Sequence, residues 1–378
     1  MRIFRLLAIP TVITCGLIAL GMTWLHSGHN HLRGDHVHTS GADVLAGVFT
    51  DEELAQLESM EADSALSTKT PPNLADAAGP SGHNDVLTIV IDFKDAGEPI
   101  TSDVFGFQTG PFDIVEYGFS DQDFDLVTNA LLAEVFDDFF DEICGSIGKG
   151  EELEINFVIG DIGVAPPGVS EFYYVQVGSV VGAGANFLGL AFGSSVRNEN
   201  GDPNPDIEIG DVVATVFTDN IQSLSNFNLS PANALSSGNL EFTTNAIVGT
   251  LSHEIGHVLS LDHVAVAQSV TPSGAAPILA TGPTGLTVQT RLEDRQFSLF
   301  GQENGTSRFN IDQLAGAVGL RPILLGDVNR DGVVNFSDIP PFIAALQGGD
   351  LVCRADIDQN GVVNFLDISP FILILQAQ

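Results

Sequence analysis

Basic residues are scarce in this sequence. Its 378 residues include 13 Lys and Arg against 49 Asp and Glu, which gives a formal net charge of -36. A surface of this charge repels nucleic acids and anionic lipids and favours cations, so we expect no nucleic-acid partner. Apolar residues make up 44% of the chain. This fraction excludes disorder throughout, and the length suits one medium-sized domain and a small module.

Cysteine and methionine are rare as well. Cys15 lies in an apolar leader, so Cys144 and Cys353 can form at most one disulfide in the mature chain, and their spacing does not require it. The three cysteines do not form a zinc ligand set. Methionine occurs only at positions 1, 22 and 60.

The first 25 residues have the features of an export signal. A basic start, Met1–Arg5, precedes an almost wholly apolar run, Leu6–Leu25, and Ala19–Gly21 offers a small-residue cleavage site. We predict a signal peptide and a secreted or cell-surface protein. An uncleaved anchor is the alternative, because about 20 apolar residues can span a bilayer. Only in that case would the protein be bound to a membrane.

Residues 26–84 carry six histidines, five of them between His26 and His38, and are otherwise rich in small, acidic and proline residues. This composition is typical of a linker or a removable pro-segment. Within it, Thr50–Met60 has the pattern of a short capped helix.

The pattern from Asp85 onward predicts an α+β domain with a twisted mixed sheet. Residues 123–143 carry apolar side chains at helical spacing, with acids on the other face. Strands are expected where short runs are rich in β-branched and aromatic residues. The expected strands are 86–93, 153–159, 172–177, 186–192 and 212–218, and further helices are expected at 243–260, 291–300 and 311–318.

The stretch 253–263 reads HEIGHVLSLDH. His253 and His257 are four residues apart, so on a helix they lie on one face and can bind one zinc ion. Glu254 is then placed to act as general base toward a zinc-bound water. His263 can reach the same metal only if the chain turns back after the helix. Three protein ligands with one open position are the pattern of a catalytic zinc site.

This stretch resembles the signature of the metzincin zinc endopeptidases, H-E-x-x-H-x-x-G-x-x-H followed by a methionine turn. All three histidines and the glutamate match, but Ser260 stands where the family has glycine. That glycine ends the helix in a left-handed conformation, which costs a residue with a side chain about 1–2 kcal/mol. In a different metalloprotease clan, a downstream glutamate such as Glu293 would be the third ligand in place of His263.

Residues 275–280 (AAPILA) resemble the methionine turn, with Leu279 in the place of the methionine. Leucine is similar in volume and equally apolar, and such replacements usually cost less than about 1.5 kcal/mol. We expect this segment to form the floor of the site. The alternative is an ordinary loop rich in proline and glycine.

The same resemblance suggests Gly189–Phe192 as an edge strand above the cleft, where an extended substrate pairs by strand addition. The P-R-C-G-x-P-D motif that keeps matrixin pro-enzymes silent is absent from the sequence. Residues 198–211 hold several carboxylates among Asn, Pro and Gly, which indicates either a further calcium site or a plain acidic loop.

Residues 326–347 and 355–376 are two copies of one pattern, identical at 13 of 22 positions. Each copy has Asp or Asn at positions 1, 3, 5, 9 and 12 of a calcium loop and glycine at position 6, where a sharp turn requires it. The valine at position 7 would offer its carbonyl. The predicted calcium ligands are Asp327, Asn329, Asp331, Val333, Asn335 and Asp338 in the first loop, and Asp356, Asp358, Asn360, Val362, Asn364 and Asp367 in the second.

This repeat resembles the dockerin type I module, in which one helix follows each loop. The resemblance implies a small all-α calcium-binding module and a cohesin-like protein partner. It places the recognition residues at positions 10 and 11 of the loops, which are Phe336, Ser337, Phe365 and Leu366 here. The alternative is a calcium-stabilised tail without a partner.

Together these features predict a signal peptide (1–25), a linker (26–84), a matrixin-like metzincin domain (85–322) and a dockerin-like module (323–378). The expected function is that of a secreted zinc endopeptidase that acts on peptides or proteins, with one zinc and two calcium ions. The alternative from another class is a surface adhesion protein whose metzincin-like domain is weakly active or inactive, because Ser260 and Leu279 depart from the family pattern.

Overall fold

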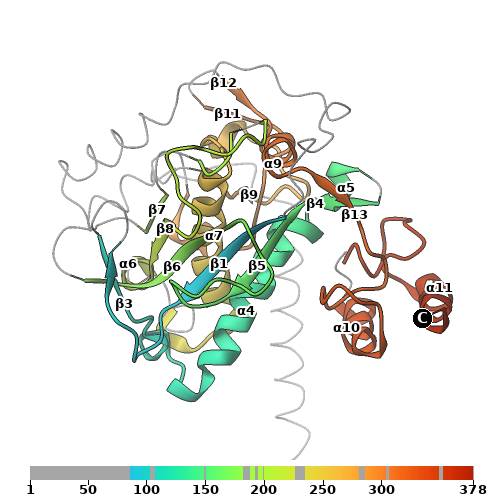
Figure 1. Ribbon diagram of the computed structural model, residues 1–378, viewed down its shortest axis with the longest axis horizontal. Coiled ribbons are helices and arrows are strands. Elements are labelled where there is room, and N and C mark those ends of the chain that lie inside the picture. Colours follow the sequence, from blue (N-terminus) through green and yellow to red (C-terminus); the bar gives the residue numbers. More distant parts are fainter. Residues whose placement is uncertain are drawn as a thin grey trace, which may run out of the picture. The chain divides into compact units, whose positions relative to one another are not determined.

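Figure 1 shows the computed structural model of the chain. The predicted signal peptide, the linker and the helix predicted at Thr50–Met60 lie outside the residues that the structure describes. Within those residues, no helix is both long enough and apolar enough to cross a membrane. The described residues are 86–102, 107–148, 150–181, 188–191, 195–198, 200–225, 235–280, 286–303, 306–348 and 352–377.

A mixed sheet forms the centre of the domain that begins near residue 86. Its strands β5, β1, β6 and β8 are parallel, with β5 at one edge, and β7 pairs antiparallel with β8. β1 is buried along its whole length because it has a strand on each side and both faces of the sheet are covered, which explains its unbroken apolar run. The strands are β1 (Leu87–Phe93), β2 (Thr101–Ser102), β3 (Gln108–Gly110), β5 (Ile155–Ile159), β6 (Phe172–Val181), β7 (Gly189–Ala191) and β8 (Val212–Phe217).

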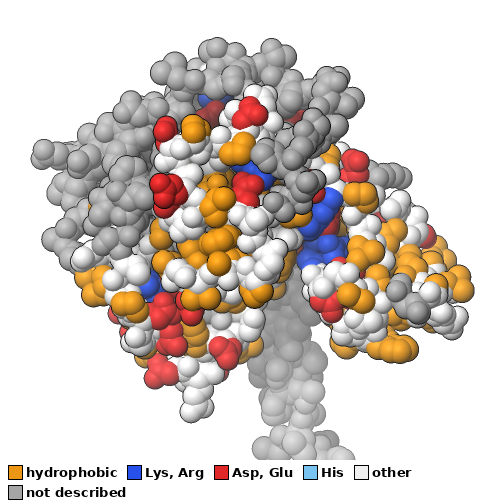
Figure 2. Space-filling model, in the orientation of Figure 1, with side chains coloured by type: hydrophobic (Ala, Val, Ile, Leu, Met, Phe, Trp, Pro, Cys, Tyr) orange, Lys and Arg blue, Asp and Glu red, His pale blue; other side chains and the backbone are white. Residues whose placement is uncertain are grey.

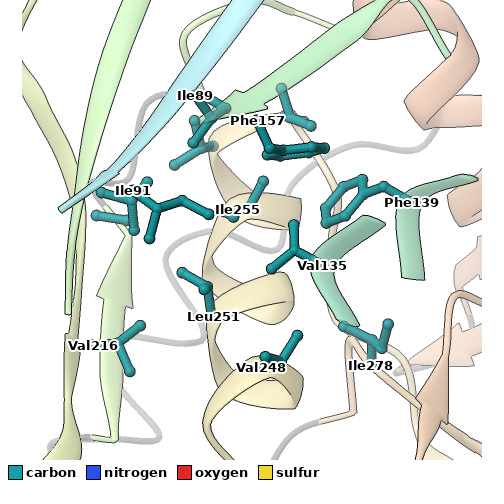
Figure 3. Packing of buried hydrophobic residues seen from close by; sticks show 14 of the residues in the cluster. Ile89, Ile91, Val135, Phe139, Phe157, Val216, Val248, Leu251, Ile255 and Ile278 are labelled. Atoms are coloured by element: carbon teal, nitrogen blue, oxygen red, sulfur yellow. The ribbon is translucent and has the colours of Figure 1, made fainter. Parts of the chain in front are cut away.

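Two helices, α4 (Phe124–Phe136) and α7 (Leu240–Val258), pack together and contribute to the main core. α7 begins at the N-cap Asn239, whose side chain accepts a hydrogen bond from Phe242 N. Its inward face places Val248, Leu251 and Ile255 against the sheet, as Figure 3 shows. Burial of each such side chain contributes roughly 1.5–3 kcal/mol, so this packing fixes the position of α7.

The mixed sheet and helices agree with the α+β expectation, and the five predicted strands are confirmed within a few residues. The single helix predicted at 123–143 is divided instead. α4 ends at Phe136, a π-helical turn η4 (Asp137–Asp141) follows, and α5 (Cys144–Ile147) completes the segment.

The helix predicted at 291–300 is wrong. A short helix, α8 (Val288–Arg291), ends before this stretch, and β10 (Arg295–Gln296) pairs in parallel with β9 (Ala276–Pro277). The Arg295 side chain is buried against Gly249 of α7. These long-range contacts outweigh the local helical pattern. The helix predicted at 311–318 is confirmed as α9 (Asn310–Val318).

The C-terminal repeat has its own small core. Each loop is followed by one helix, α10 (Ile339–Gly348) or α11 (Phe365–Gln376), and Phe342 stacks on Phe371 with ring centroids 4.1 Å apart. The remaining elements of the described residues are η2 (Ile114–Tyr117), η3 (Asp121–Asp123), β4 (Glu151–Leu153), α6 (Thr218–Ser225), η5 (Leu235–Ser237), η6 (Val266–Gln268), β11 (Gly301–Glu303), β12 (Thr306–Arg308), β13 (Leu320–Pro322) and η8 (Phe336–Asp338).

A disulfide joins Cys144 of α5 to Cys353, which precedes the second loop of the repeat. The two residues are 209 positions apart in the sequence, and their Cα atoms are 6.4 Å apart. The sequence allowed this pair without requiring it. β13 also pairs antiparallel with β4. The repeat is therefore attached to the preceding domain by a covalent bond as well as by the chain.

Replacement of Cys144 and Cys353 by serine is expected to lower the free energy of unfolding by about 2–5 kcal/mol, because the bond constrains a very long loop of the unfolded chain. Urea unfolding with and without a thiol reductant measures this loss. The wild-type midpoint should fall in reductant, and the double variant should not respond. A wild-type unfolding midpoint that is the same with and without reductant would contradict the presence of the disulfide.

Candidate metal centre

Three histidine side chains meet at the C-terminal end of α7. The Nε2 atoms of His253 and His257 are 3.0 Å apart, and those of His253 and His263 are 3.2 Å apart. The third separation, between His257 and His263, is 2.9 Å. A tetrahedral zinc ion with bonds of about 2.0–2.1 Å holds its nitrogens roughly 3.3–3.4 Å apart. The three nitrogens are slightly closer together than this, and they are near enough to share one metal ion.

Backbone carbonyls orient two of these rings. His253 Nδ1 is 2.7 Å from Ile278 O, and His257 Nδ1 is 2.8 Å from Leu261 O. A carbonyl oxygen can only accept, so each Nδ1 carries the proton and each Nε2 presents a lone pair. Two lone pairs cannot hydrogen-bond to each other. The residues present thus fit a metal cation.

Burial keeps the imidazoles neutral. Loss of hydration lowers the pKa of His257, and it lowers the pKa of His253 and of His263 well below the usual range. Repulsion between the rings lowers the pKa of His253 and His263 further. Neutral imidazole is the form that binds metal.

A left-handed turn brings His263 back to the helix. Ser260 has φ 70°, its N–H donates to His257 O at 3.0 Å, and Leu261 N donates to Gly256 O at 2.9 Å. This is the Schellman arrangement that usually places glycine at this position. The chain reverses here, so the third histidine reaches the first two.

Ser260 has contacts of its own that glycine could not make. Its hydroxyl oxygen lies 2.6 Å from Ser195 Oγ and 2.6 Å from Arg197 O. Arg197 is buried and pairs with both carboxylate oxygens of Glu171. The serine therefore links the turn to Ser195 and Arg197. Sequence reasoning recognised the cost of Ser260 but not this compensation.

Glu254 lies against the edge strand β7. A Cβ atom built on Gly189 would be 2.6 Å from Glu254 Cγ and 2.7 Å from its Oε1. Only glycine permits this approach. The predicted edge strand and the predicted general base are therefore neighbours. The sequence suggested Gly189 as part of a strand, but it gave no sign of the contact with Glu254.

Leu279 is fully buried beneath α7, and its Cδ2 would be 3.1 Å from a Cβ on Gly256. Its neighbour Ile278 supplies the carbonyl that holds His253. The segment at 275–280 thus lies under the histidines, in the position expected for the floor of the site.

Two other predicted metal positions are not assembled. Neither Glu293 nor any described carboxylate of 198–211 belongs to a cluster of three possible ligands among the described residues. Two carboxylate groups that sequence reasoning missed do bring oxygens within 4.8 Å of one another: Asp92, Glu98 and Asp161, and Asp138, Glu142 and Asp294.

Asp138 connects one of these groups to the back of α7. Its Oδ2 accepts a hydrogen bond from Ser252 Oγ at 2.5 Å. Burial raises the pKa of Asp138 well above its usual range. Acids within the apolar stretch FDDFFDE were the sequence signal for this buried group. The hydrogen bond with Asp138 holds Ser252, the residue that precedes His253.

The two loops of the repeat are wound around their carboxylates. In the second loop, Asp356 Oδ2 accepts from Gly361 N at 2.7 Å, and Asp367 Oδ1 accepts from Asp358 N at 3.1 Å. Oxygens of these three aspartates lie within 4.8 Å of one another, a span that Ca–O bonds of about 2.4 Å can bridge. Asn364 Nδ2 reaches Val362 O at 3.1 Å. Asn360 Oδ1 accepts from Val362 N at 3.0 Å.

The first loop repeats the pattern. Asp327 Oδ2 accepts from Gly332 N at 3.1 Å, and Asp338 Oδ1 accepts from Asn329 N at 3.0 Å. Asp331 Oδ1 accepts from Val333 N at 2.9 Å, and Asn335 Nδ2 reaches Val333 O at 3.1 Å. The hydrogen bonds from position 6 to position 1 and from position 3 to position 12 are thus the same in both loops, although among the described residues only the second loop brings three carboxylates within 4.8 Å of one another.

Comparison of the sequence with protein-family models and with curated proteins gave no match.

Substitution at Ser260 tests the account of the turn. Ser260→Ala keeps the left-handed strain and loses the hydroxyl contact, so it should destabilise by about 0.5–1.5 kcal/mol. Ser260→Gly loses the same contact but relieves strain of about 1 kcal/mol, so it should be near neutral. Urea unfolding of the zinc-loaded proteins measures both. Equal loss in the two variants would show that the conformation at Ser260 carries no strain.

Proposed function

We propose that this protein is a secreted zinc endopeptidase of metzincin type. The observation that supports this best is the meeting of three buried imidazoles, two of them oriented by backbone carbonyls, beside one buried carboxylate. His253, His257 and His263 would hold the metal, and their arrangement leaves a fourth position for water or substrate. Zinc bound there would lower the pKa of a water and polarise the scissile carbonyl.

Glu254 is the general base in this proposal. It is one residue from a metal ligand on the same helix and is largely buried, so its carboxylate is held in place. It takes the proton from the attacking water and delivers it to the leaving amine. β7 supports an extended substrate by antiparallel pairing, because among the described strands it pairs with β8 alone.

The repeat is proposed to bind two calcium ions and a protein partner. Phe336 and Phe365, at position 10 of each loop, are 77% and 83% exposed, and Leu366 is 68% exposed. Apolar side chains are prominent around α10 and α11 in Figure 2. Such large exposed rings are typical of contact residues, and a cohesin-like protein is the proposed partner.

Glu254→Gln is expected to reduce peptide cleavage by about 10²–10⁴-fold, because it removes the general base and leaves the three histidines in place. The assay is digestion of a peptide library by zinc-loaded protein, with metal analysis of both variants. Cleavage by the wild type alone supports the endopeptidase. Absence of cleavage by zinc-loaded, folded wild type favours the adhesion protein with an inactive domain.

Gly189→Ala gives an independent test of the geometry. The added methyl group would overlap the Glu254 side chain, so we expect a large loss of cleavage with unchanged zinc content. Ala191→Gly, on the same strand, is the control and should retain most activity. Full activity in Gly189→Ala would contradict the position of the general base.

A further inference from the structure

The attachment of the repeat to the catalytic domain centres on Glu152 of β4. This carboxylate is 3% exposed and contacts three arginines. Arg354 Nη2 lies 2.6 Å from Glu152 Oε1 and Arg354 Nε 3.1 Å from Oε2, so this pair is bidentate. Arg321 Nε is 2.8 Å from Oε1, and Arg330 Nη1 is 3.2 Å from Oε2. Two of these arginines, Arg330 and Arg354, belong to the repeat.

Arg330 makes a second set of contacts with the catalytic domain. Its Nη2 is 3.0 Å from Asp141 Oδ1, and its guanidinium lies 4.4 Å from the centre of the Phe140 ring. The same Asp141 oxygen accepts from Cys353 N at 3.1 Å, beside the disulfide. The π-helical turn η4 supplies both Phe140 and Asp141. Ion pairs, a cation–π contact and a disulfide bond thus occur together where the repeat contacts the preceding domain.

The arginines at this interface favour the ionised form of Glu152. Burial alone would raise the pKa of Glu152, but hydrogen bonds and charge from Arg354, with the charges of Arg330 and Arg321, outweigh burial and hold the pKa below its usual range. Removal of one partner from such a buried network leaves an uncompensated charge and is strongly destabilising.

Both arginines of the repeat are connected to the first loop. Arg330 is position 4 of that loop and has a left-handed backbone, φ 60°. Arg354 contacts the side chain of Asp327, position 1 of the loop, and its Nη1 is 3.2 Å from Asp327 O. The direction in which both guanidinium groups point therefore depends on how the loop is wound.

Asp327 shows that the loop is suited to a cation. The residue is fully buried, and its Oδ2 is occupied by Gly332 N and Arg354. Its Oδ1 is buried and has no hydrogen-bond partner. A buried carboxylate oxygen without a partner is costly, and at position 1 of a calcium loop it is a metal ligand.

We propose that the first loop is a calcium-dependent clasp within the molecule. Calcium in this loop holds Arg330 and Arg354 on Asp141 and Glu152, so that calcium stabilises the catalytic domain through the repeat. This rests on the proposed calcium site at residues 327–338. In the clasped state these ion pairs are formed, and in the open state they are broken. A ligand that binds the clasped state more tightly than the open state must stabilise the clasped state. The repeat is then a part of the enzyme as well as a docking module.

The sequence provides a selective reporter for this effect. Its three tyrosines, Tyr117, Tyr173 and Tyr174, all lie in the catalytic domain, and its one tryptophan, Trp24, lies in the predicted signal peptide. Tyrosine fluorescence of residues 26–378 therefore follows unfolding of the catalytic domain alone. Thermal midpoints are measured with zinc held constant, in calcium and in chelator selective for calcium, and calorimetry counts the calcium ions bound.

Arg330→Gln is the decisive variant. Gln359 occupies position 4 of the second loop with φ 55°, so glutamine suits this backbone, and no calcium ligand is changed. We expect calcium to raise the wild-type tyrosine midpoint by about 4 °C or more, and at least half of that rise to be lost in Arg330→Gln while two calcium ions still bind.

A matched pair separates the two loops. Asp327→Asn and Asp356→Asn alter the same position of the first and second loops, and only the first should abolish the calcium-induced rise. An equal rise in wild type and Arg330→Gln, with two ions bound to each, would overturn the clasp and leave the calcium sites intact. Absence of calcium binding to the wild type would overturn both the calcium sites and the clasp.

Discussion

Three imidazole Nε2 atoms meet at the site, and those of His253 and His257 present lone pairs to each other, which is unfavourable without a cation. Carbonyl oxygens of Ile278 and Leu261 fix the protonated nitrogens of His253 and His257 on the other side of each ring, so these rings cannot rotate to relieve the repulsion at low cost. Everything else at the site depends on this constraint. The floor segment supplies one carbonyl, the reversed chain supplies the other and the third ring, and the sheet holds α7 where they meet.

The two departures from the metzincin pattern differ in their consequences. Leu279 is buried beneath Gly256 and fills the space as an apolar side chain of similar volume would. Ser260 takes the strained conformation that glycine takes freely, and its hydroxyl contacts Ser195 and Arg197 in return. Neither change removes a group that the proposed chemistry needs. Both are therefore compatible with an active enzyme.

The repeat and the domain that precedes it share more than a chain connection. Glu152 and Asp141 pair with Arg354 and Arg330 of the repeat, and the Cys144–Cys353 bond lies beside them. The rings at position 10 of both loops remain exposed. A module held in this way presents these rings at a fixed position relative to the domain that precedes it, where a flexible tether would not. In the function and the clasp that we propose, calcium would act both in docking and in stability.

Local patterns in the sequence determined the helix that carries His253, Glu254 and His257, the strands of the sheet and both calcium-type loops, because spacing along the chain sets these features directly. The turn at Ser260 was also foreseeable, since His263 requires a reversal. Only the tertiary structure decided that residues 295–296 form a strand, that Gly189 touches Glu254, that Cys144 meets Cys353, and that Arg330 and Arg354 converge on Glu152. Each of these joins residues distant in sequence, and the free energy that selects them comes from burial and charge pairing, which no local pattern records.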